Sequence, residues 1–97
     1  MASFIPFDYE ELTVGVGAAA QRLTQSRAEA ADQVVLRCTG GTARFRMDAT
    51  NPTATVGIPH GEETFSLTKP EGIGFRVILA SGETVAHVCR ATFYRLA

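Results

Sequence analysis

The chain has no tryptophan, a single lysine and no long hydrophobic run. With Tyr9 and Tyr94 as its only tyrosines, it has few of the exposed aromatic rings on which sugars stack, so a glycan-binding module is a poorly supported alternative. No apolar stretch approaches the roughly 18 residues of a membrane span, so we expect no membrane partner. The first ten residues lack the basic start and apolar centre of a signal peptide, and we expect synthesis in a cytoplasm.

Positive charge is not in excess. The 97 residues carry nine Lys and Arg against ten Asp and Glu, which gives a formal net charge of -1. Nucleic-acid binding draws most of its affinity from a surplus of basic side chains, so we expect no nucleic-acid partner. All the basic residues except Lys69 are arginines, which suit planar contacts at protein interfaces. A GC-rich genome would give the same bias.

Motifs for catalysis are also missing. The two histidines, His60 and His87, stand in a turn and a strand-like run, and no His, Cys and carboxylate group has metal-ligand spacing. The acidic pairs at 10–11 and 62–63 are adjacent residues, which point to opposite faces of a strand. No serine has the Gly-x-Ser-x-Gly context of a nucleophile elbow. We therefore expect no enzyme activity, no catalytic residue, no cofactor and no metal.

The two cysteines, Cys38 and Cys89, are far apart in sequence, and both fall inside strand-like runs. Free cysteine in such a place usually acts as a small buried hydrophobic residue, and a cytoplasm keeps it reduced. Should adjacent strands bring the two together, a disulfide remains an alternative once the protein leaves the cell.

Short alternating or β-branched runs, separated by turn residues, make up most of the chain. They predict strands at 11–18, 33–39, 42–48, 54–58, 64–67, 74–80 and 84–96. Turn signals at this spacing are typical of an all-β fold, a single compact β-sandwich or partly closed barrel of about 7–8 short antiparallel strands. The domain should span residues 10–97, after an extended N-terminal arm at 1–9.

Three local features are also predicted. Gly40-Gly41 should join the runs at 33–39 and 42–48 as a hairpin. Residues 24–32 are helix-friendly but too short to pack as a helix, and indicate a loop with at most one helical turn. The last strand should place one set of residues on a single face: Val85, His87, Cys89, Ala91 and Phe93.

The N-terminal arm contains Phe4, Ile5 and Phe7 around Pro6, which favours an extended conformation at the preceding residue. An apolar extended tail either packs on its own domain or docks on a neighbour. We expect these residues to precede the first regular strand, and removal of residues 2–7 to leave the β domain folded.

Residues 44–57 read Arg-Phe-Arg-Met-Asp-Ala-Thr-Asn-Pro-Thr-Ala-Thr-Val-Gly. This segment resembles the motif Arg-aromatic-Arg-x-Asp-Gly-Thr-x-Pro-Thr-Ala-x-x-Gly of small all-β structural proteins of tailed bacteriophages. The surrounding order is similar too, with a Leu-Thr-Val run first, Val-Val-Leu-Arg before the motif and Gly-Phe-Arg-x-Ile after it. The resemblance covers about residues 11–94. Ala49 departs from the motif, which has glycine there, so the turn after Asp48 either needs no positive φ or differs in geometry.

The resemblance implies a virion structural protein whose partners are phage capsid or tail proteins, with homo-oligomers possible. A capsid decoration (cement) role is favoured; a head-tail or tail adaptor, a glycan- or receptor-binding module on the virion, and an interaction domain unrelated to phages are the alternatives. The candidate partner interface combines the arm residues Phe4, Ile5 and Phe7 with Arg44 and Arg46, which alternation places on one face of their strand.

Overall fold

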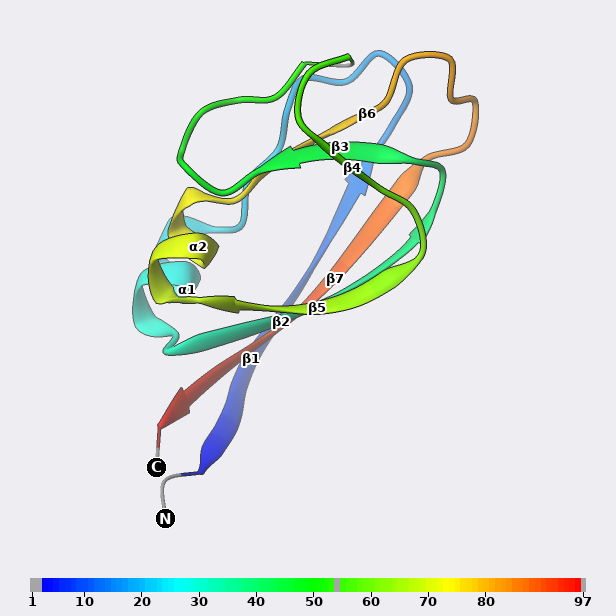
Figure 1. Cartoon of the computed structure of the whole chain (residues 1–97). Coiled ribbons are helices and arrows are strands. Elements are labelled where there is room, and N and C mark those ends of the chain that lie inside the picture. Colours follow the sequence, from blue (N-terminus) through cyan, green and yellow to red (C-terminus); the bar gives the residue numbers. More distant parts are fainter. Residues whose placement is uncertain (1–2, 54, 97) are drawn as a thin grey trace.

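The computed structural model describes residues 3–53 and 55–96, excepting the side chain of His60. In this part of the chain two antiparallel sheets pack face to face (Figure 1). The all-β prediction is confirmed, and the architecture is a sandwich and not a closed barrel.

The larger sheet has four strands in the order β1-β7-β2-β5, and the smaller has three in the order β4-β3-β6, counted over the described residues. The larger sheet consists of β1 (Phe4–Val14), β7 (His87–Leu96), β2 (Gln33–Gly40) and β5 (Glu63–Thr68). The smaller sheet consists of β4 (Ile58–His60), β3 (Ala43–Arg46) and β6 (Arg76–Leu79), and Gln21 adds an isolated bridge to β6. The strand expected at 54–58 lies later, as β4, and Ala54 is outside the described residues.

Alternating residues of the two sheets meet in a buried core. On β7 the four residues His87, Cys89, Ala91 and Phe93 are buried, which confirms the predicted face, whereas Val85 precedes the strand and is exposed. Three phenylalanine rings pack together between the sheets with centroids 5.5–6.5 Å apart: Phe45 of β3, Phe65 of β5 and Phe75 just before β6. Burial of such side chains is the main source of stability in a domain of this size.

The hairpin predicted at Gly40-Gly41 is wrong. β2 pairs with β7 and β5, whereas β3 pairs with β4 and β6, so the two glycines carry the chain from one sheet to the other. Gly40 has φ +98°, and a Cβ there would collide with the carbonyl oxygen of Ala86. A Cβ on Gly41 would collide with the carbonyl oxygen of Val85. The glycines therefore permit a close approach between two backbone segments.

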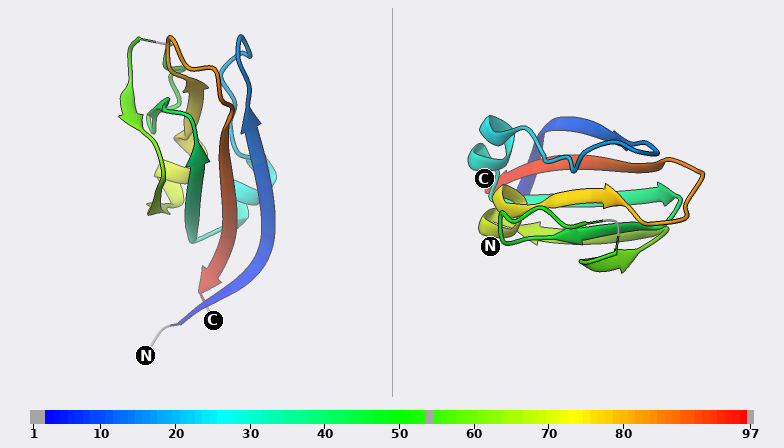
Figure 2. Two further views of the ribbon diagram at one scale, coloured as in Figure 1. Left: turned by 90° about the vertical axis from the view of Figure 1, so that its right-hand side faces the viewer. Right: turned by 90° about the horizontal axis from the view of Figure 1, so that it is seen from above.

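Two short helices lie at one end of the sandwich (Figures 1 and 2). Residues 24–32 contain α1 (Gln25–Ala30), whose Ala28 is buried. α2 (Lys69–Gly74) lies between the strands expected at 64–67 and 74–80, where no helix was predicted. A capping box between Thr68 and Glu71 starts α2, and proline is favourable in the first helical turn. The Thr-x-x-Glu spacing was the sequence signal for this helix.

β1 begins earlier than predicted. It runs without interruption from Phe4 to Val14, so the expectation that the arm residues precede the first regular strand is wrong, and the boundary expected after residue 9 falls inside β1. The strand pairs with β7 from Phe4↔Leu96 to Val14↔His87, with a register shift between Pro6 and Asp8. Because β1 is an edge strand, Pro6 is tolerated in it although proline has no N–H to donate.

Candidate functional site

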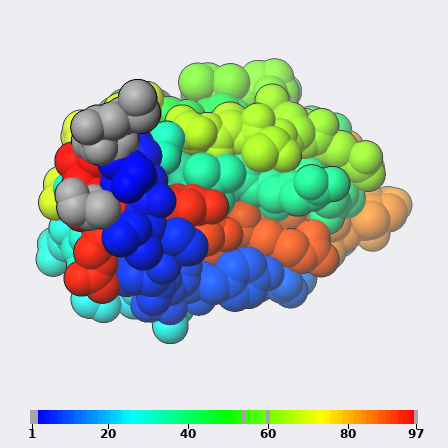
Figure 3. All heavy atoms as spheres, turned by 90° about the horizontal axis from the view of Figure 1, so that it is seen from below, coloured from blue at the N-terminus to red at the C-terminus, as the bar shows by residue number. Residues whose placement is uncertain are grey.

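The ends of β1 and β7 form a projecting ribbon, which we define as residues 4–6 and 94–96. β2 pairs with β7 only as far as Gln33↔Tyr94, so the last two pairs, Phe4↔Leu96 and Ile5↔Arg95, have no third strand beside them. Figure 2 shows both strand ends extending past the rest of the sandwich. Figure 3 shows the outer face of the larger sheet, with the start of β1 (dark blue) beside the end of β7 (red).

The three predicted arm residues divide into two groups. Phe7 packs against the core, with its ring 6.5 Å from that of Phe93 and the Arg95 guanidinium 4.4 Å from its centroid. This guanidinium is placed for a cation–π interaction. Phe4 and Ile5 instead remain 46% and 49% exposed, and Leu96 opposite them is 48% exposed. Phe7 therefore packs on its own domain, whereas the ribbon leaves three large apolar side chains partly exposed to solvent.

Arg44 and Arg46 lie on the outer side of β3, away from the ribbon, and both have internal partners. Arg46 forms a salt bridge with Asp48, and this contact lowers the pKa of the Asp48 carboxyl. Arg44 donates to the carbonyl of Gly57 at 3.2 Å. The arginines thus help to hold the loop between β3 and β4, and the structure does not join them to the arm residues in one surface.

The turn after Asp48 has the geometry that the motif's glycine suggests. Ala49 has φ 64°, the one positive value among described residues other than glycine. The Asp48 carboxylate accepts the N–H of Thr50, and the N–H of Ala49 donates to the carbonyl of Gly74 at 3.0 Å. These bonds hold Ala49 in a conformation that strains an L-residue.

Replacing Ala49 by glycine should therefore raise the free energy of unfolding by about 1 kcal/mol, because glycine adopts positive φ without strain. Chemical denaturation measures the change. The matched control is Ala19→Gly, in another exposed loop with no positive φ, where the added freedom of the unfolded chain should lower stability. Equal effects of the two substitutions would contradict the described turn.

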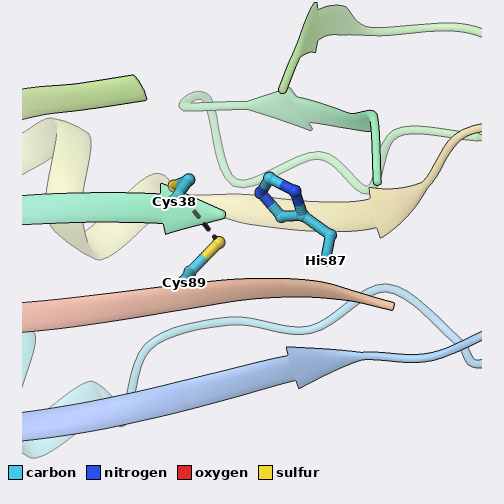
Figure 4. Close-up of side chains that lie close together, drawn as sticks. All are labelled: Cys38, His87 and Cys89. Atoms are coloured by element: carbon cyan, nitrogen blue, oxygen red, sulfur yellow. Dashed lines mark hydrogen bonds between the residues drawn. The ribbon is translucent and has the colours of Figure 1, made fainter. Parts of the chain in front are cut away.

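A second cluster lies inside the sandwich, where Cys38 of β2 directly faces Cys89 of β7 (Figure 4). Their sulfur atoms are 3.5 Å apart without a disulfide bond between them, and His87 lies beside them with its ligand atom within 4.8 Å of each sulfur. All three residues are at most 1% exposed. Burial by itself lowers the pKa of His87, but hydrogen bonds with Cys38 and with the Gly41 carbonyl outweigh it and raise this pKa above its ordinary value.

Sequence spacing missed this cluster because Cys38 is distant in the chain. The available signal was His87-x-Cys89, since residues two apart on a strand share a face. The cluster also settles how the cysteines are placed: they are buried as predicted, and adjacent strands do bring them together.

We expect neither thiol of the metal-free folded protein to react with a bulky thiol reagent. Contact with Cys38 and burial raise the pKa of the Cys89 thiol far above its usual range, and the thiolate is the reactive form. Labelling should occur only on unfolding, and a Ser81→Cys variant, at an exposed turn position, should label at once. Rapid labelling of the unsubstituted protein would contradict the described burial.

Comparison of the chain with protein-family models, with curated proteins and with solved structures finds no match. Among the described residues, neither helix has the length and apolar character to cross a membrane.

Proposed function

We propose that this chain is a non-enzymatic structural protein of a tailed-phage virion that decorates the capsid, and that the projecting ribbon is its point of attachment. The class rests on the motif at 44–57 and the order of the runs around it. The attachment rests on one observation: Phe4 and Leu96, paired on one face of the ribbon, and Ile5 on its other face are all about half exposed at the end of the molecule. Apolar side chains gathered in this way are typical of protein contact sites.

The ribbon suits attachment to a neighbouring subunit for a second reason. β1 is an edge strand of the larger sheet, so its outer backbone groups are free of a neighbouring strand in the described fold. An edge strand can extend the sheet of a partner while its side chains fill adjacent pockets. The ribbon therefore offers both backbone hydrogen bonds and apolar anchors.

The motif itself fits an internal role better than a contact role. Arg44 is bound to Gly57, Arg46 is bound to Asp48, and Pro52 is buried in the loop. A Cβ added at Gly57 would lie 2.9 Å from the Pro52 side chain, so the loop closes tightly on itself. The motif residues thus shape the β3–β4 connection and leave the ribbon as the better candidate for binding.

The proposal is tested by quantitative mass spectrometry of purified particles of the phage that encodes this chain. A decoration protein is repeated over the capsid lattice, so we expect a copy number in fixed ratio to the major capsid protein. A copy number matching a single ring would replace decoration by an adaptor role at the head-tail junction. Absence of the chain from washed particles would overturn a virion function.

A further inference from the structure

We propose that Cys38, His87 and Cys89 form a binding site for one zinc ion. The two sulfur atoms are 3.5 Å apart, and no two of the three ligand atoms lie farther apart than 4.8 Å. Zinc–sulfur bonds of about 2.3 Å and zinc–nitrogen bonds of about 2.0–2.1 Å place tetrahedral ligand atoms some 3.5–3.8 Å from one another. The cluster needs only a small inward movement of the imidazole to reach this geometry.

The orientation of His87 is already that of a metal ligand. Its Nδ1 lies 2.6 Å from the carbonyl oxygen of Gly41, and because a carbonyl can only accept, Nδ1–H is the donor. Metal-binding histidines commonly donate one ring N–H to a backbone carbonyl, which fixes the ring and leaves the other nitrogen for the metal. In Figure 4 the ring lies next to the two cysteine side chains.

Charge selects a divalent ion. Two thiolates and a neutral imidazole carry a total charge of -2, which one Zn²⁺ cancels, so the buried site becomes neutral. Coordination forms two Zn–S bonds and one Zn–N bond. It releases two protons, one from Cys89 and one from the Cys38–His87 pair, whichever member holds it. A monovalent soft ion would leave a buried negative charge, which is costly.

A cavity of about 190 Å³ lies on the side of the cluster formed by Cys38, and Glu62, Glu63 and Arg37 also border it. Glu63 lies opposite Cys38 in the β2–β5 register, and its negative charge acts on His87. Water can take the fourth, uncharged position, as it does in many zinc sites, and the Glu63 carboxylate adds a negative potential that favours the approach of a cation.

The site is tested on the reduced, metal-free full chain by titration with Co²⁺, which reports tetrahedral thiolate coordination by its absorption spectrum. We expect one equivalent to give sulfur-to-cobalt charge-transfer and intense visible bands, and one equivalent of Zn²⁺ to abolish them. Zinc binding in weak buffer should release two protons per ion and raise the melting temperature. Saturation without charge-transfer bands, or the lack of any saturable binding, would overturn the proposal.

Substitutions of the proposed ligands distinguish metal binding at this site from adventitious metal binding elsewhere on the chain. We expect each of the variants Cys38→Ser, Cys89→Ser and His87→Gln to weaken cobalt binding at least tenfold. Glu63→Gln should weaken it by a smaller factor. The control His60→Gln, which removes the other histidine, should leave cobalt binding unchanged. Should a core variant fail to fold, the spectrum and proton count of the unsubstituted chain still decide. A chain that is isolated with a Cys38–Cys89 disulfide and binds no zinc after reduction would show a redox pair in place of a metal site.

Discussion

Replacing Gly40 by alanine is expected to lower the free energy of unfolding by about 3 kcal/mol, since positive φ and steric overlap each cost about 1–3 kcal/mol. Both costs apply because Gly40 has φ +98° and its Cβ would meet the backbone of Ala86. Neither segment can move away without separating β2 from β7. Denaturant unfolding, monitored by circular dichroism, measures the loss.

Two other glycines serve as graded controls for this prediction. Gly17 has φ +74° with nothing near its Cβ position, and Gly15 has neither positive φ nor a close neighbour. Alanine at Gly17 should cost about 1 kcal/mol, and alanine at Gly15 should change stability by less than about 0.5 kcal/mol. Equal tolerance at all three positions would show that the chain does not cross between sheets at Gly40.

The combined variant Phe4→Ser, Ile5→Ser and Leu96→Ser is expected to fold normally and to bind its particle on the order of 100-fold more weakly, the equivalent of about 3 kcal/mol of lost apolar burial. The three side chains are about half exposed in the free chain and none belongs to the buried core, so the substitutions should leave the fold intact. A binding assay with particles stripped of the chain gives the affinity, and thermal unfolding confirms the fold.

The matched control places the same kind of substitution away from the ribbon. Val16, Val56 and Val85 are exposed by 67%, 57% and 59%, and all three stand in loops. Their combined replacement by serine should leave particle binding unchanged. Equal weakening by both variants would mean a non-specific loss of apolar surface. Full binding by the ribbon variant would transfer the contact site to the face of Arg44 and Arg46.

Alternation of apolar and polar residues predicted most of the strands, because successive side chains of a half-buried strand point to opposite faces of the sheet. The β7 face from His87 to Phe93 could be predicted in this way. Which strands pair with which could not be predicted from the sequence. Gly40-Gly41 is compatible with a hairpin or with a crossing between sheets, and the crossing occurs because β7 lies beside β2. The start of β1 was missed for the same reason, since its partner is the opposite end of the chain.

In the candidate sites, too, the residue types could be predicted from the sequence, whereas their arrangement depends on strand pairing. Apolar residues at 4, 5 and 7 were visible in the sequence, but only the register shift near Pro6 determines that Phe7 turns to the core while its neighbours stay exposed. The Cys38 and Cys89 thiols meet because two strands 51 positions apart are aligned in register. Alignment of this kind is a property of the sheet and has no local sequence signal.

High-resolution imaging of the assembled particle tests the central claim most directly. We predict density for the sandwich on the outer surface of the capsid, with Phe4, Ile5 and Leu96 buried against the major capsid protein or between its subunits. A particle whose capsid surface lacks this density, or whose bound chain directs the ribbon to solvent, would contradict the proposed attachment.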